Sequence, residues 1–139
     1  MRGIEVLLQQ GWGWDAGCWG AWRAAAPPRV RLLSADRGYF GAPFSPEGQP
    51  RVLVAHSFGL HLLESRWLER VALVVVLGGF QVFHPEEEEA GRRSRRLVGR
   101  MRQRLDREPD ALLADFRARC FFPEPGLYVS SGRADLELL

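Results

Sequence analysis

The sequence contains no lysine, threonine or asparagine, and all 19 of its basic residues are arginine. Its two cysteines, Cys18 and Cys120, are too few for a disulfide framework or a cysteine metal cluster, and we expect both to be reduced and at least partly buried. The longest apolar run, residues 71–77, falls well short of the about 20 residues that cross a bilayer. Residues 4–8 are too short a run for a signal peptide. We therefore expect a cytoplasmic protein.

The sequence does contain enough apolar material for one domain. Hydrophobic residues make up 46% and charged residues 26% of its 139 residues, which fits a globular protein with a core. The net charge is only +2, yet eight arginines fall within residues 92–107. Such a segment can be a solvated helix face, a docking face for an acidic protein or a phosphate-binding surface. An apolar stripe and the glutamates at residues 86–89 favour the first two over nucleic-acid or membrane binding.

Short apolar runs alternate with helical or irregular segments in the first part of the chain. We expect strands at residues 4–8, 30–34, 52–55 and 71–77, and helices at residues 16–26 and 60–68. The last run is apolar throughout, which is typical of a central strand buried on both faces. This alternation predicts an α/β fold with an open, mainly parallel sheet, whose ligand site lies at the carboxyl ends of the strands.

The segment after the fourth strand has a different character. Residues 86–107 and 110–120 each predict an amphipathic helix. The first helix carries an apolar stripe made of Leu97, Met101 and Leu105. Two such helices after a buried strand predict an inserted helical lid. The chain is accordingly divided into three parts: a core over residues 1–84, a lid over residues 85–126 and a short tail over residues 127–139.

A serine turn follows the third strand and carries the candidate chemistry. Residues 55–59 read Ala-His-Ser-Phe-Gly between an apolar run and a helix, which is similar to the G-x-S-x-G pattern of a nucleophile elbow. Small residues are needed on both sides of the serine because the strand and the helix pass close to each other there. Ser57 is therefore the candidate nucleophile. The alternative is an ordinary serine that precedes a helix.

Three stretches together carry a resemblance to a known family. Residues 7–19 contain a strand and a Gly-Trp-Gly turn, residues 55–59 the serine turn, and residues 96–120 the arginine-rich helices. The chain resembles the α/β-hydrolase fold, and more closely the pimeloyl-[acyl-carrier protein] methyl ester esterases of biotin synthesis. The resemblance implies a serine carboxylesterase that hydrolyses an acyl-carrier-protein-linked methyl ester, or a small ester, through an acyl-enzyme and without cofactor or metal. Another esterase or lipase of the same fold is an alternative.

The resemblance also assigns roles to residues. Ser57 matches the nucleophile, and the backbone N–H groups of Trp12 and Phe58 match the oxyanion hole. Phe116 and Cys120 match lid residues that line the site of the acyl chain. Lid arginines that match a surface gripping the acidic carrier protein are Arg95, Arg96 and Arg100.

The chain departs from the family pattern in several places. Gln10 replaces the histidine of the glycine-rich turn, and Cys120 stands where the family often has glutamine. The fold orders its triad as serine, acid, histidine, but no histidine follows His84. We therefore expect a chain truncated after its lid, whose catalytic acid and base are missing or come from another chain. A hydrolase-like protein without catalysis, which binds an acidic partner through the lid arginines, is the main alternative.

The three histidines have separate expected places. His56 precedes the serine and is expected to point away from its hydroxyl, and His61 is expected to pack beneath the turn. His84 is expected at the hinge of the lid, with the role of catalytic base as the less favoured alternative.

Overall fold

The structure, a computed structural model, describes residues 3–120 and confirms the predicted α/β class with a parallel sheet. The four strands are all parallel and lie in the order β2-β1-β3-β4. They are β1 (Ile4–Gln9), β2 (Val30–Ala35), β3 (Val52–His56) and β4 (Leu73–Leu77). The short helices between them are η1 (Ala16–Trp19), α1 (Gly20–Ala25), α2 (Gly59–Leu62) and α3 (Ser65–Leu68).

Side chains at alternate positions along the strands pack into two hydrophobic cores, one on each face of the sheet. Leu53 of β3 packs with Trp67 of α3 on one face, and both are buried. The next residue, Val54, packs on the other face with Trp19. The centre of the sheet is therefore covered on both sides by short helices.

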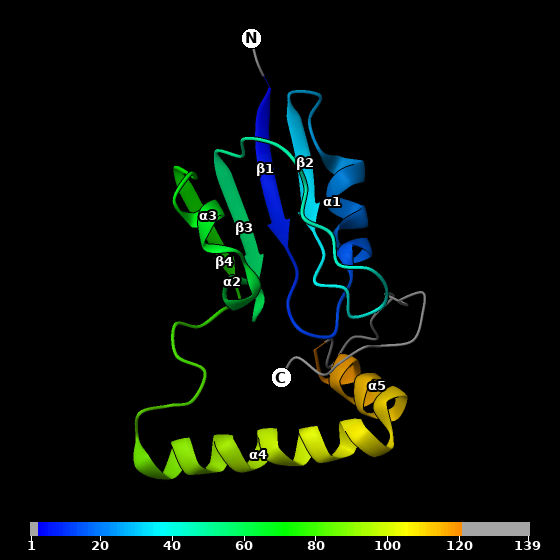
Figure 1. Cartoon of the computed structure of the whole chain (residues 1–139), viewed down its shortest axis with the longest axis vertical. Helices are drawn as coiled ribbons and strands as arrows, with labels where there is room; N and C mark the ends of the chain where they lie inside the picture. The colour runs from blue at the N-terminus through cyan, green and yellow to red at the C-terminus, as the bar shows by residue number, and fades with distance from the viewer. Residues whose placement is uncertain (1–2, 121–139) are drawn as a thin grey trace.

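A pair of longer helices follows the sheet. The carboxyl ends of the strands point toward α4 (Glu88–Arg107) and α5 (Pro109–Cys120), and α4 lies apart from the sheet while α5 lies nearer to it (Figure 1). Leu112 and Leu113 of α5 pack in a third cluster with Trp12 and Tyr39. None of the helices within residues 3–120 is long and apolar enough to cross a membrane. Residues 121–126 of the predicted lid and the predicted tail lie outside the described residues.

The prediction that β4 is a central, buried strand is wrong. β4 lies at the end of the sheet beyond β3, and Leu73, Val74 and Val76 are 54%, 40% and 42% exposed. The apolar composition correctly indicated a strand. The composition could not show that, within residues 3–120, β4 has a neighbouring strand on one side only.

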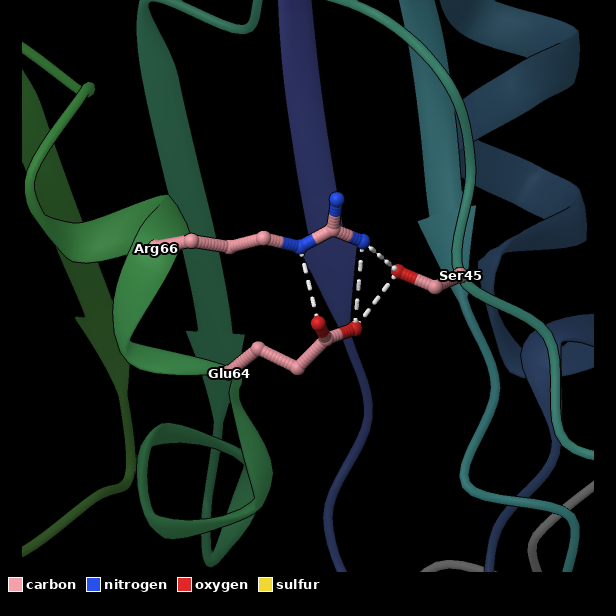
Figure 2. A network of polar contacts seen from close by, with 3 residues as sticks. All are labelled: Ser45, Glu64 and Arg66. Atoms are coloured by element: carbon pink, nitrogen blue, oxygen red, sulfur yellow. Dashed lines mark hydrogen bonds and ion pairs between the residues drawn. The ribbon is translucent and has the colours of Figure 1, made fainter.

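The single helix predicted over residues 60–68 is also wrong, because the chain leaves helical geometry at Leu63 and Glu64. Both residues are extended, with ψ angles of 143° and 133°. Figure 2 shows Glu64 and Arg66 meeting Ser45 from the loop after β2, and the Ser45 hydroxyl donates to Glu64 at 2.7 Å. Glu64 makes this contact at the break between the two helices, and Leu63 packs there against the core around Leu53.

Two further expectations need correction in the helical pair. Met101 and Leu105 of the predicted apolar stripe pack against the cluster that contains Leu112 and Leu113 of α5, but Leu97 of the same stripe is 50% exposed. Both cysteines were expected to be at least partly buried; Cys18 is half-buried, as expected, whereas Cys120 is exposed. Cys120 lies at the end of α5, where the chain leaves the packed part of the helix.

Candidate functional site

The serine turn connects β3 to α2 at the carboxyl edge of the sheet. Ser57 has a φ of +53°, in the left-handed region that side chains with a Cβ rarely adopt. Its amide donates to the carbonyl of Leu77 at the end of β4, at 2.8 Å. A conformation of this kind costs roughly 1–3 kcal/mol and persists only where the surroundings hold it. The hydrogen bond to β4 therefore helps to hold Ser57 in this strained conformation.

Two glycines let the turn approach the end of β1. A Cβ on Gly59 would lie 2.6 Å from the carbonyl oxygen of Gln9, closer than real contacts allow. A Cβ on Gly11 would lie 2.9 Å from the carbonyl oxygen of His56 and 3.0 Å from the Cβ of Ser57. The predicted need for a small residue at Gly59 thus has a geometric cause. Gly11 was missed as a packing residue, although a glycine two residues after the end of β1 was the available signal.

The same contact brings the turn after β1 next to the Phe58 amide. A Cβ on Gly11 would lie 3.3 Å from the Phe58 nitrogen, and Trp12 follows Gly11 directly. Phe58 is the N-cap of α2, so its N–H has no acceptor inside that helix. Within residues 3–120, neither the Trp12 amide nor the Phe58 amide donates a hydrogen bond to a backbone acceptor. The Phe58 amide and the turn that carries Trp12 therefore lie next to Ser57.

Helix α5 covers the Gly-Trp-Gly turn. The ring of Phe116 meets the ring of Trp12 edge-on, with centroids 4.9 Å apart and an interplanar angle of 79°. Trp12 is only 4% exposed, and Leu113 packs against Gly13. The structure thus brings together Ser57, Phe58, Trp12 and Phe116. It does not bring Cys120 into this cluster, because Cys120 is exposed at the end of α5.

Arg117 fastens α5 to the same turn and was missed by the sequence reasoning. Its Nη2 atom donates to the carbonyl oxygen of Gly13 at 2.9 Å. Its guanidinium also lies 5.2 Å from the ring centroids of both Trp14 and Phe40, within the range of cation–π attraction. No local pattern marked Arg117, because the carbonyl that it binds lies 104 residues away in sequence.

The three histidines of the chain make no hydrogen bond to Ser57 in the described residues. His61 forms a 2.9 Å hydrogen bond with the carbonyl of Phe80 and stacks on Phe58, at the surface rather than beneath the turn. His84 forms a 2.9 Å hydrogen bond with the hydroxyl of Ser94 on α4, which fits its expected place at the start of the helical pair. Burial lowers the pKa of His56, which favours its neutral form. Within residues 3–120, no histidine or carboxylate hydrogen-bonds to the Ser57 hydroxyl.

Several polar atoms are buried at this end of the sheet. Gln10 is fully buried, and neither its amide nitrogen nor its oxygen has a partner among residues 3–120. The Tyr39 hydroxyl beside Trp12 is equally buried, and burial raises its pKa to about 12. Tyr39 therefore stays protonated at neutral pH and can act only as a neutral hydrogen-bonding group.

The arginines of α4 fall into two groups. Arg92 and Arg104 form ion pairs within the helical pair, at 2.6 Å to Glu88 and 2.9 Å to Asp115. The other six arginines of α4 are exposed and make no ion pair within the described part of the chain: Arg93, Arg95, Arg96, Arg100, Arg102 and Arg107. This second group leaves positive charge open on the face of α4.

A cavity lies away from Ser57, and no metal-binding cluster is found in the described part of the chain. A hollow of about 970 Å³ opens at the amino ends of the strands and is lined by residues that include Glu5, Arg51 and Leu73. Ser57 lies at the opposite, carboxyl end of the strands. In the stretch from residue 3 to residue 120, no group of three or more His, Cys, Asp or Glu side chains could hold a metal ion.

Comparison with protein-family models and with curated proteins finds no match to this chain. Any function must therefore be argued from the geometry around Ser57 and from the resemblance in sequence motifs.

Proposed function

We propose that this chain is a serine carboxylesterase of the α/β-hydrolase type, with Ser57 as its nucleophile. The observation that supports this most directly is the positive φ of Ser57 at the end of a parallel strand. Such a turn lifts a side chain out of the sheet edge, where ligands of α/β proteins bind. The glycines that hold it in place and the two amides beside it add to this support.

The proposed reaction has two steps. In the first step, Ser57 Oγ forms a bond to the ester carbonyl carbon and its proton passes to a base. The bond to the alkoxy oxygen then breaks, and the alcohol leaves with a proton. In the second step, water attacks the acyl-enzyme, which releases the carboxylic acid and restores the serine. The amides of Trp12 and Phe58 would stabilise the oxyanion in both steps, each by about 3 kcal/mol.

The base in this scheme must come from outside the contacts that the structure describes. None of the three histidines hydrogen-bonds to Ser57, and two of them are bound elsewhere. We propose that the base is supplied by residues beyond the described part or by another chain. Without it, the proton of Ser57 would pass to water and turnover would be slow.

The finer proposal concerns the substrate. The motif resemblance favours a methyl ester of an acyl chain held on acyl carrier protein. Phe116 would line the site of the acyl chain, with Cys120 further along α5. Because Trp12 is 4% exposed beneath Phe116, a substrate could reach its amide only after α5 moves away. The helical pair would then act as a lid.

The test is hydrolysis of p-nitrophenyl and methyl esters by the full chain, by Ser57→Ala and by Ser65→Ala. Ser65 is an exposed serine in α3 and serves as the matched control. We expect Ser57→Ala to lower the rate to the uncatalysed background and Ser65→Ala to leave it unchanged. Equal rates for the chain and Ser57→Ala would refute the esterase proposal.

A second candidate is a protein without catalysis that binds an acidic partner. It is favoured by the exposed, unpaired Arg95, Arg96 and Arg100 and by the lack of a base at Ser57. Changing all three to Glu should abolish binding to acyl carrier protein. The matched control reverses the same number of charges away from α4, at Arg29, Arg37 and Arg70. An equal loss of binding in both triple variants would show a general effect of charge and would refute the proposed binding through Arg95, Arg96 and Arg100.

A further inference from the structure

The outer edge of β4 is apolar and has no partner strand among residues 3–120. Ten large hydrophobic residues are exposed in this part of the chain, and six of them fall between residues 68 and 83. These six are Leu68, Leu73, Val74, Val76, Val82 and Phe83. Three of the six, Leu73, Val74 and Val76, lie on β4 itself, and exposed apolar residues concentrated in one segment are typical of an interaction surface.

The backbone of β4 presents its free hydrogen-bonding groups at two positions. The Leu73 N–H donates to the carbonyl of Arg51, and the Leu77 carbonyl accepts from the Ser57 amide, so both residues direct their backbone toward β3. Because these directions alternate along a strand, the N–H and C=O groups of Val74 and Val76 point away from β3. They form the free edge.

The sequence of β4 is symmetric about its middle residue. It reads Leu-Val-Val-Val-Leu over Leu73–Leu77, so the same letters result in either direction from Val75. A twofold axis at Val75 would place Val74 opposite Val76 of the second copy. These are the two residues whose backbone groups face outward, and in an antiparallel ladder such a pair exchanges both hydrogen bonds. The side chains and the backbone thus fit the same register.

Nothing in this edge discourages pairing with another copy. Residues 71–83 contain no charged residue and no proline, whereas natural edge strands are commonly protected by both. The opposite edge of the sheet differs. β2 carries the exposed Arg31, and the chain after β2 folds back in an antiparallel bridge between Asp36 and Phe44. The chain's net charge of +2 adds little repulsion between copies.

From these observations we propose that β4 pairs in antiparallel fashion with β4 of a second copy of this chain, across a twofold axis at Val75. The two sheets of four strands would join into one continuous sheet. Isologous contacts of this kind are the commonest way in which proteins form dimers. Because a stable interface buries about 1,600 Å² in total, and two strands of five residues bury less, we expect a weak dimer in rapid exchange.

The first test measures the mass of the full chain against concentration by sedimentation equilibrium. We expect a shift from monomer to dimer, and Val74→Lys should weaken the dimer by at least roughly tenfold, since it places a charge beside the free edge of each copy. Ile4→Lys is the matched control, because Ile4 is a 52% exposed strand residue far from this edge, and it should leave the dimer unchanged. A monomer at every concentration would overturn the proposal, including the case in which residues 121–139 cover β4.

The second test fixes the register by disulfide crosslinking in the full chain with Cys18 and Cys120 changed to Ser. Residues that meet at the axis are a non-hydrogen-bonded pair with Cα atoms about 4.5 Å apart, within reach of a disulfide. Val75→Cys should therefore crosslink to itself on oxidation. Val74→Cys should not, because its counterpart is Val76 of the second copy. A dimer in which Val75→Cys fails to crosslink, or in which both variants crosslink equally, would contradict the proposed pairing.

Discussion

The neighbouring strands β3 and β4 are both apolar, yet they have very different surroundings. Leu53 and Ala55 of β3 are completely buried, whereas Leu73 and Val74 of β4 are 54% and 40% exposed. β3 has a strand on each side and a tryptophan over each face, while β4 has one neighbouring strand within the described part. The exposure of an apolar strand therefore depends on its position in the sheet, and that position also decides what the strand is free to bind.

The largest effect is expected from Leu53→Ala, compared with Val74→Ala. Leu53→Ala leaves a cavity in a closed core and should lower the free energy of unfolding by about 3 kcal/mol. Val74→Ala removes methyl groups that are already partly in water and should cost less than about 1 kcal/mol. Urea unfolding at low protein concentration, where association is negligible, measures both. Similar losses would mean that β4 is covered in solution.

The next largest effect is expected at the contact between the ends of β1 and β3. Gly59→Ala places a methyl group 2.6 Å from the carbonyl of Gln9 and should cost about 2 kcal/mol, because backbone must move to admit it. Gly20→Ala is the matched control, since a Cβ on Gly20 meets nothing within 4 Å. It should be neutral or slightly stabilising by helix propensity. A harmless Gly59→Ala would show that the serine turn is looser than the structure indicates.

A smaller effect is expected where α5 meets the sheet. Arg117→Met removes the hydrogen bond to the Gly13 carbonyl and the stacking on Trp14, and should cost about 1–2 kcal/mol. The cost should be local, so hydrogen exchange should speed up in α5 and change little in β3. Arg119→Met, which alters an exposed arginine of the same helix, is the control. Uniform acceleration across the chain would contradict a separate opening of the helical pair.

The smallest effect is expected at the network of Ser45, Glu64 and Arg66. The hydrogen bond from Ser45, together with Arg66, lowers the pKa of Glu64 from its ordinary value of 4.5. A lowered pKa in the folded state contributes stability above pH 4.5 that is lost as the pH falls through the folded-state value. Glu64→Gln should therefore slightly flatten the acid side of the stability profile. Glu69→Gln is the control. Identical stability profiles for the two variants would show that the network does not contribute to stability.

The sequence predicted the local features well. The spans of β1, β2 and β3 were each predicted to within one residue, because their apolar runs end at turn-forming or polar residues. The strained turn at Ser57 and the need for a small residue at Gly59 were predicted for a similar reason, since their spacing reflects a contact between adjacent segments. The parallel sheet followed from the alternation of strands and helices.

The features that depend on distant contacts were missed. The edge position of β4 depends on which strands pair, and the break before α3 involves Ser45, 19 residues away from Glu64. The anchor from Arg117 to Gly13 spans 104 residues. None of these contacts can be recognised from the local sequence of the segment whose structure it affects.

Labelling with a fluorophosphonate, followed by peptide mass analysis, tests whether the turn after β3 presents Ser57 as a nucleophile. This reagent reacts with an activated serine and needs no substrate of known structure. We expect a single adduct on Ser57, retained in Ser65→Ala and lost in Ser57→Ala. A chain that is folded but takes up no label, or is labelled equally on other serines, would contradict the claim.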